Sequence, residues 1–333
     1  MSWKSWMTVR QAQGDTFLWR RRAAPAIDFS YGDRRLAGVR AAARHRGAAG
    51  WPAIREQLAA AEDGEDLTFL VEGVQGVSGV ERWIEEVLHA APGDAHALLV
   101  SGARHVGWAW HARGRFAAGA APESQRTLFR ERLETAQRRL FAAAEREPAW
   151  AAPWYFLQLA GQGLELGPQV AQERFAAACR RSPGHAAAHR QHLRQLAAQG
   201  DGAHERTHAF ARAAMLDAPE GSRLGELVAL AHLEEWRDRG GDPDSAWLGR
   251  PQVIEALREA AAHSVLHPAF GRRLDWPLAL NAFAMAFALA GDHRSAAPLF
   301  RALGNRPTET PWIYLDARSP LAAFRTWRAR VTG

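Results

Sequence analysis

The sequence has very few of the residues on which several common kinds of protein site depend. Its one cysteine, Cys179, excludes an intrachain disulfide framework. Lys4 is its one lysine, so a phosphate-binding loop that ends a glycine-rich turn in lysine is absent. The sequence also lacks a Gly-x-Ser-x-Gly elbow, a Cys-x-x-Cys pair and calcium-loop spacing. These absences disfavour nucleotide-dependent enzymes and enzymes that use a serine or cysteine nucleophile.

Long hydrophobic runs are missing too. No apolar run approaches the roughly 18 residues that a membrane span needs. The first residues show no apolar segment of the kind found in secretion signals. Together with the single cysteine, which we interpret as a small core residue in FAAACRR, this predicts a cytoplasmic protein with no membrane partner.

The positive charge is concentrated at one end of the chain. The net charge is +6, and residues 1–60 alone carry eleven Lys/Arg against four Asp/Glu. We interpret residues 1–33 as a basic, partly irregular arm and residues 34–333 as a single helical domain. Arginines such as Arg20–Arg22 could contact nucleic acid or an acidic partner, but a solvated arm is the interpretation we favour.

Regularly placed prolines follow the helical stretches. Pro148, Pro183 and Pro219 lie 35 and 36 residues apart, close to the 34-residue period of a helix–turn–helix repeat. Pro92 and Pro268 continue the series at longer intervals. The pattern predicts an all-α fold, an α-solenoid of antiparallel helix pairs with core repeats over about residues 66–307. The β-branched stretch 67–74 (LTFLVEGV) fits a first helix of a repeat better than a strand.

Small and aromatic residues recur at helix-packing positions in these stretches. One unit has Tyr155, Ala171, Phe175 and Ala178, and the last has Phe283, Ala284, Phe287, Gly291, Ala296 and Phe300. On these residues the chain resembles tetratricopeptide repeat proteins. From Trp110 onward it also resembles an uncharacterised bacterial family of helical-repeat proteins, which brings no activity with it. The resemblance implies a superhelix whose concave face binds a peptide or protein.

A His-Glu-x-x-His pattern at His204, Glu205 and His208 carries the one candidate chemistry. On a helix, residues four apart share a face, so both imidazoles could bind one zinc ion with Glu205 as the base. His192 of the preceding helix is the expected third ligand, and Glu226 or His232 of the following helix are open alternatives. The motif resembles that of zinc metallopeptidases, although Arg206 stands where those enzymes usually have an uncharged residue.

Basic and aromatic side chains on first helices of the units could instead line a groove. The candidate groove residues are Arg104, Trp108, Trp154, His189 and His192. Core packing between helix pairs is the competing interpretation for the tryptophans. The leading prediction is a protein- or peptide-binding scaffold without catalysis or cofactor. The alternatives are a zinc-dependent hydrolase at 204–208 and, as the least favoured partner, nucleic acid at the arginine-rich end.

Overall fold

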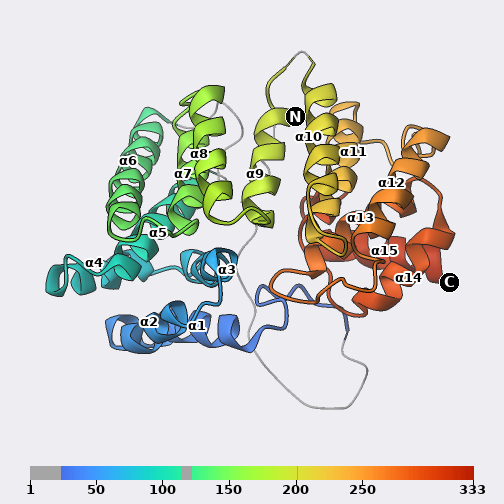
Figure 1. The fold of residues 1–333 in the computed structure, drawn as a ribbon. Helices are drawn as coiled ribbons and strands as arrows, with labels where there is room; N and C mark the ends of the chain where they lie inside the picture. Colours follow the sequence, from blue (N-terminus) through green and yellow to red (C-terminus); the bar gives the residue numbers. More distant parts are fainter. Residues whose placement is uncertain (1–23, 114–121, 201) are drawn as a thin grey trace. The chain divides into compact units, whose positions relative to one another are not determined.

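The structure, a computed structural model, describes residues 24–113, 122–200 and 202–333 (Figure 1). Every regular element in these ranges is helical, and none of the described residues forms a strand. The all-helical prediction is therefore confirmed, and residues 67–74 lie within helix α3 (Gly64–Gln75). The chain divides into two compact units, one of residues 32–195 and one of residues 196–333 together with 24–31, and the division falls inside helix α9 (Ala186–Ala197).

The 32–195 unit contains helices α1 to α8 and most of α9. Besides α3 and α9 its elements are α1 (Arg34–His45), η2 (Gly47–Gly50), α2 (Trp51–Ala59), α4 (Val80–Ala90), α5 (Ala95–Arg113), α6 (Glu123–Arg146), α7 (Ala152–Gly163) and α8 (Pro168–Arg181). Helix α3 packs against α1, α5 and α7, and each of α4, α6 and α8 packs against a neighbour in the chain. Successive helices thus form the layers of this unit.

Helices α5 and α6 share the most extensive contact between elements of the 32–195 unit. A side chain at Gly102 of α5 would place its Cβ 2.6 Å from Cγ of Leu140 in α6, which is too short for two carbon atoms. Leu133, Ala136 and Leu140 follow one face of α6 and are fully buried against this contact. The glycine therefore permits the backbones to approach, and the α6 stripe supplies the buried apolar area that stabilises the pair.

Aspartates begin several of these helices. Asp33 accepts a hydrogen bond from Leu36 N at 3.0 Å, and Asp63 accepts from Glu65 N and Asp66 N at 2.9 and 2.8 Å. Such N-caps satisfy amides that have no partner within the helix. Buried Asp66 in turn accepts two 2.8 Å hydrogen bonds from Arg35, which joins α1 to α3. Arg35, one of the basic residues near the N-terminal arm, is thus part of an internal ion pair.

The 196–333 unit contains the remaining elements. They are α10 (Ala203–Leu216), η3 (Arg223–Gly225), α11 (Glu226–Asp238), α12 (Pro251–His263), α13 (Pro277–Leu289), α14 (His293–Leu303), η4 (Trp312–Tyr314) and α15 (Pro320–Thr332). Helix α13 is buried on nearly all sides and contacts α11, α12, α14 and α15. Phe300, Trp312 and Phe324 pack together beside it, with ring centroids 5.4 to 5.9 Å apart. This aromatic group joins α14, η4 and α15 into one core.

The prolines mark helix ends as the sequence predicts. Helices α4, α6, α8, α10 and α12 each end shortly before Pro92, Pro148, Pro183, Pro219 and Pro268, respectively. Proline cannot donate a backbone hydrogen bond and disfavours a helical conformation in the preceding residue. In the parts of the chain that the structure describes, no helix has both the length and the apolar character required to cross a bilayer.

Candidate functional site

Helices α10 and α11 pack against each other in the 196–333 unit and bring three metal-ligand side chains together. His208 comes from α10, and His232 and Glu235 come from α11, where their spacing of three residues places them on one face. One possible ligand atom from each residue lies within 4.8 Å of the other two. We call these three residues the His–Glu cluster. It is the one such group of three among the described residues.

Glu235 is the hydrogen-bonding centre of the cluster. One carboxylate oxygen, Oε2, lies 2.8 Å from Nε2 of His208, and the other, Oε1, accepts a 2.9 Å hydrogen bond from Arg239. Burial alone would raise the pKa of Glu235, but the hydrogen bonds from Arg239 and His208 outweigh it and lower that pKa. Glu235 is therefore a carboxylate at neutral pH although it is only 8% exposed.

His232 is enclosed to nearly the same extent as Glu235. Its side chain is 9% exposed, its ring centroid lies 4.4 Å from that of His208, and its Nδ1 is buried without a hydrogen-bond partner. Burial, together with the neighbouring His208, lowers the pKa of His232 to about 3. The ring is therefore neutral at physiological pH, which is the form that binds metal ions. Two imidazoles and one carboxylate are a donor set that zinc accepts.

The sequence motif at 204–208 supplies one member of this group. His208 belongs to the cluster, whereas His204 does not, and Glu205 is exposed on α10. Thr207, between them, is buried and donates to the Ala203 carbonyl at 2.7 Å, so it turns inward as part of the core. His192, the expected third ligand, belongs to the 32–195 unit. Of the open alternatives, His232 is the one in the cluster, and Glu226 is not.

His189 and His192 of α9 pack against helix α8. The His192 ring stacks on Phe175 with centroids 4.2 Å apart and planes 4° from parallel, and His189 meets the same ring edge-on at 5.0 Å. Both side chains are buried, and burial lowers the pKa of each, that of His192 to about 4. Cys179 lies beside His189, and burial raises the pKa of its thiol to about 12, which keeps it protonated.

The other three predicted groove residues are distributed over different helix pairs of the 32–195 unit. Trp154 meets Phe141 edge-on at 6.1 Å, and Arg181 lies 4.9 Å above it. Arg104 is 5% exposed and donates to Glu81 at 2.7 Å and to the Gln75 carbonyl at 2.8 Å. These contacts hold helices together, and their arrangement as one groove stays a prediction.

Trp108 has a different environment, because it is only half-buried and carries a cation on its face. The Arg132 guanidinium of α6 lies 3.6 Å from the centre of the indole ring. Its Nε is buried without an acceptor, and its one hydrogen bond, from Nη1 to the Trp108 carbonyl, is long at 3.4 Å. No described carboxylate forms an ion pair with it. We call these two residues the Arg132–Trp108 pair.

Arg132 was not a candidate from the sequence, because it lies among five other arginines of α6. Burial lowers the pKa of Arg132, and the nearby Arg104 lowers it further. Glu81 raises that pKa in part, but its carboxylate is paired with Arg104. A half-buried cation beside a second cation gains from an additional anion. The pair is therefore a surface feature at which an external anion would be favourable.

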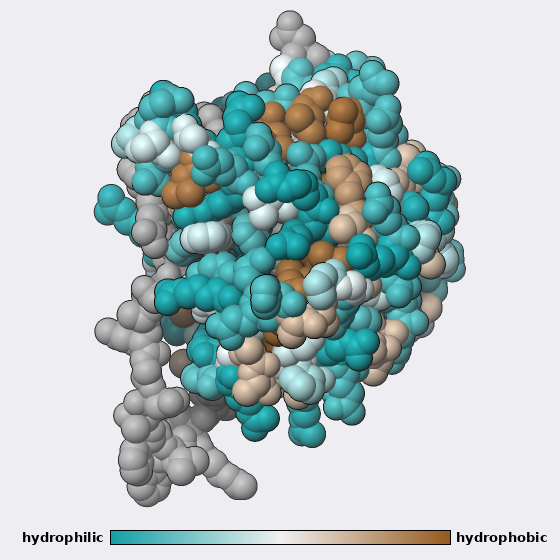
Figure 2. All heavy atoms as spheres, turned by 90° about the vertical axis from the view of Figure 1, so that its left-hand side faces the viewer, coloured by the Kyte–Doolittle hydropathy of each residue, from teal (hydrophilic) through white to brown (hydrophobic). Residues whose placement is uncertain are grey.

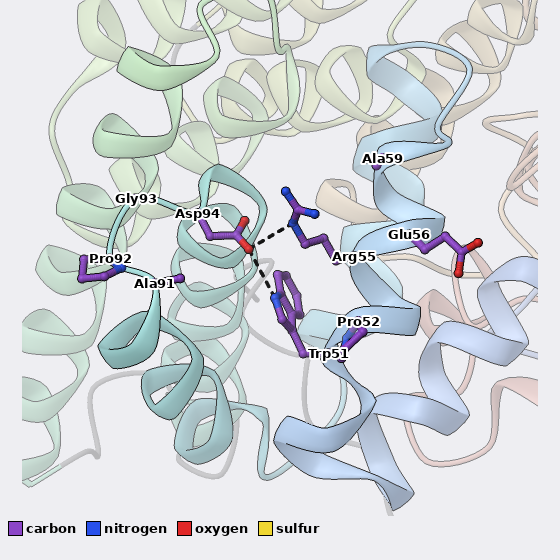
Figure 3. Close-up of a pocket in the computed structure, with 9 residues that line it drawn as sticks. All are labelled: Trp51, Pro52, Arg55, Glu56, Ala59, Ala91, Pro92, Gly93 and Asp94. Atoms are coloured by element: carbon purple, nitrogen blue, oxygen red, sulfur yellow. Dashed lines mark hydrogen bonds and ion pairs between the residues drawn. The ribbon is translucent and has the colours of Figure 1, made fainter.

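A hollow of about 770 Å³ lies between α2 and the turn that precedes α5 (Figure 3). Trp51 and Arg55 point across it toward Asp94, which accepts hydrogen bonds from Trp51 Nε1 at 3.3 Å and forms a 3.2 Å ion pair with Arg55. The same carboxylate caps α5 through His96 N and Ala97 N. These polar groups form hydrogen bonds and an ion pair with one another. The hollow therefore offers a ligand few unpaired polar groups.

The arginine-rich end of the chain is described only in part, and Arg34, Arg44 and Arg46 of that end are exposed. Arg20–Arg22 lie outside the described residues, as does the segment 114–121 between α5 and α6. Within the described part, Arg35 is paired with Asp66 and Arg40 donates to the Gly73 carbonyl at 3.2 Å. Comparison of the chain with protein-family models and with curated proteins finds no match.

Proposed function

We propose that the chain is a binding scaffold for a protein or peptide partner and has no catalytic role in that interaction. Under this proposal its helix pairs form a tetratricopeptide-like array in the cytoplasm. The succession of packed helices α3 to α8 supports the proposal, because stacked helix pairs present extended surfaces suited to partner binding. The observation that carries it is the Arg132–Trp108 pair.

The surface chemistry favours a polar and charged partner over an apolar one. The large apolar side chains that are exposed in the described residues are few: Phe141, Leu166, Leu216 and Leu266. Figure 2 shows one face on which hydrophilic side chains dominate and hydrophobic residues occur in small separate patches. Broad apolar interfaces require a larger contiguous patch. Recognition at this face is therefore expected to depend on specific charged anchors.

The Arg132–Trp108 pair is suited to an acidic side chain of a peptide. The guanidinium is fixed on the indole face, and no described residue accepts a hydrogen bond from its Nη2. An Asp or Glu of the partner could accept charge-assisted hydrogen bonds there, which are roughly twice as strong as neutral ones. Trp108 would supply the apolar contact beside them, and arginine and tryptophan are common anchors at interfaces.

Peptide selection on the full-length chain tests this proposal. Peptides from a random displayed library are selected on the immobilised protein, and the Kd of each is measured by fluorescence anisotropy. We expect the bound peptides to contain an acidic residue, and we expect Arg132→Gln to weaken binding at least about tenfold, the loss of one charge-assisted hydrogen bond.

Arg130→Gln is the matched control, because Arg130 is on the same helix, exposed, and carries the same charge. It should change the Kd less than about twofold, as expected for an exposed charge outside the contact. If no peptide binds, or if Arg130→Gln weakens binding as much as Arg132→Gln does, the proposed site is wrong. Trp108→Leu should also weaken binding, since the indole face is lost.

A further inference from the structure

We propose that His208, His232 and Glu235 form a binding site for a divalent metal ion of the zinc class. This inference is independent of the proposed partner binding, because the His–Glu cluster lies within the 196–333 unit and the Arg132–Trp108 pair within the 32–195 unit. The motif at 204–208 predicts two ligands on α10, His204 and His208, and a third ligand from a neighbouring helix. The structure instead joins one histidine of that motif to two residues of α11.

The separations between the ligand atoms are close to those of a zinc site. Four-coordinate zinc with bonds of about 2.0–2.1 Å places neighbouring ligand atoms about 3.3 Å apart. In the cluster, Nε2 of His208 and Oε2 of Glu235 lie 2.8 Å apart, and all three ligand atoms lie within 4.8 Å of one another. Side-chain shifts of about 1 Å would therefore bring the three atoms around one ion. No rearrangement of α10 or α11 is required.

His232 gives an independent reason to expect a ligand. The residue is 9% exposed, and its Nδ1 is buried without a hydrogen-bond partner. An enclosed polar atom without a partner costs about 1–3 kcal/mol of folding free energy. An ion bound between the rings of His208 and His232 would give the His232 imidazole, which lacks one hydrogen-bond partner within the protein, an interaction as a metal ligand.

The positive charge of Arg239 next to Glu235 disfavours the binding of a cation at the cluster. The position of its guanidinium reduces this repulsion. It donates to Oε1 of Glu235, whereas Oε2 faces His208. The guanidinium is also stacked 3.7 Å from the centre of the Trp247 ring and is 49% exposed, so its charge is partly screened by solvent. An ion that binds Oε2 would leave the Arg239 hydrogen bond in place. Arg239 then orients the ligand carboxylate, as outer partners of metal ligands commonly do.

Three protein ligands leave one position of a tetrahedral ion open. The side chain of His208 is 28% exposed, so the cluster is reached by solvent from the α10 side. A water molecule or a ligand atom of a partner could occupy that position, as in zinc sites with three protein ligands. The donor set of two imidazoles and one carboxylate favours zinc, cobalt or nickel over calcium or magnesium, which prefer oxygen ligands.

Metal binding to the full-length, tag-free chain tests the inference. The protein is dialysed against zinc after chelation, and bound zinc is measured by elemental analysis. We expect one ion per chain for the wild type. His208→Ala and Glu235→Gln should each reduce zinc affinity at least about tenfold, because each removes one of three ligands. Glu235→Gln keeps the size of the side chain and the fold can be checked by circular dichroism.

His204→Ala is the matched control, since it removes the other histidine of the same motif on the same helix. It should bind zinc as the wild type does. Absence of stoichiometric zinc from the wild type would overturn the inference, and so would equal loss of zinc in His204→Ala and His208→Ala. Cobalt gives a second readout, because intense visible bands report four-coordinate geometry. These bands should vanish in His232→Ala if that variant folds, and in Glu235→Gln in any case.

Discussion

The two compact units use their buried histidines in different ways. In the 32–195 unit, His185 lies 2.8 Å from the Thr68 hydroxyl and stacks on Tyr155, while His189 and His192 pack on Phe175. In the 196–333 unit, His208 and His232 lie beside each other and beside the Glu235 carboxylate. The first set takes part in helix packing, and the second has the composition of a metal site.

The difference shows what decides the role of a histidine in a helical core. Four of the five residues lie on helices of similar length, and His185 directly precedes α9. Burial lowers the pKa of His192 and of His232 alike. The two sets of histidines differ in their surroundings. The His–Glu cluster has a carboxylate at ligand distance and is accessible to solvent through His208. A lowered histidine pKa alone is therefore a sign of burial, and a ligand site also needs further donor atoms at coordinating distance, which Glu235 and the second imidazole supply in the His–Glu cluster.

Zinc should stabilise the 196–333 unit, and this is the largest effect we expect. An ion present at 1,000 times its Kd adds about 4 kcal/mol to the free energy of unfolding, because it binds the folded chain and not the unfolded one. Thermal unfolding of the wild type should shift upward with zinc, and chelation should reverse the shift. Glu235→Gln should show little shift at the same zinc concentration. An equal shift in both proteins would mean that the ion acts elsewhere.

Thr68→Val should destabilise the 32–195 unit by about 2 kcal/mol without changing zinc binding. The substitution keeps the shape of the side chain but removes the hydroxyl that is hydrogen-bonded to buried His185, and a weakened buried pair costs about 1–3 kcal/mol. Urea unfolding measures the loss. If Thr68→Val leaves stability unchanged, then His185 does not depend on this contact, and the structural role that we assign to the α9 histidines is weakened.

Stability should fall as the pH is lowered, partly through His192. Burial lowers the pKa of His192 to about 4, so the folded ring stays neutral where an unfolded ring with a pKa near 6.5 takes up a proton. Its contribution is complete above about pH 6.5 and is lost as the pH falls toward 4. Between pH 7 and 5.5 the loss is about 1 kcal/mol. Urea unfolding of metal-free wild type should show it, and His192→Gln should have a smaller slope.

Arg239→Gln should produce the smallest change. Its ion pair with Glu235 is half-exposed on the arginine side, so the loss of stability should stay below about 1 kcal/mol. Removal of a cation beside the cluster should also strengthen zinc binding by a fewfold, unless Arg239 is needed to orient the carboxylate. Zinc titrations of the wild type and Arg239→Gln compare these two contributions. A loss of affinity would show that orientation outweighs charge repulsion.

The helical fold and several helix ends could be predicted from the sequence, since they depend on local rules. Helix α1 begins at Arg34 as expected after the capping Asp33, and α8 ends before Pro183. The buried faces of α13 and α14 include Phe283, Phe287 and Phe300, which the repeat spacing identifies. Such features follow from periodicity, caps and prolines, and these act within a few residues.

The His–Glu cluster could be predicted only in part. The spacing of His204 and His208 identifies a helix with histidines on one side. It cannot show which of these two histidines lies close to a ligand residue of another helix. His232 and Glu235 lie 24 and 27 residues beyond His208, and their placement depends on how α10 packs on α11. Arg132 could not be identified from the sequence for a similar reason, because its contact with Trp108 is between two helices.

The comparison of the two histidine sets is tested most directly by nuclear magnetic resonance of the imidazole nitrogens. Zinc is titrated into the chain labelled with ¹⁵N-histidine, with single His→Gln variants used to assign the signals. We predict that the signals of the ring nitrogens of His208 and His232 shift or broaden with one equivalent of zinc. The signals of His185, His189 and His192 should not change. A response of the α9 histidines, or of His204 in place of His232, would contradict the account.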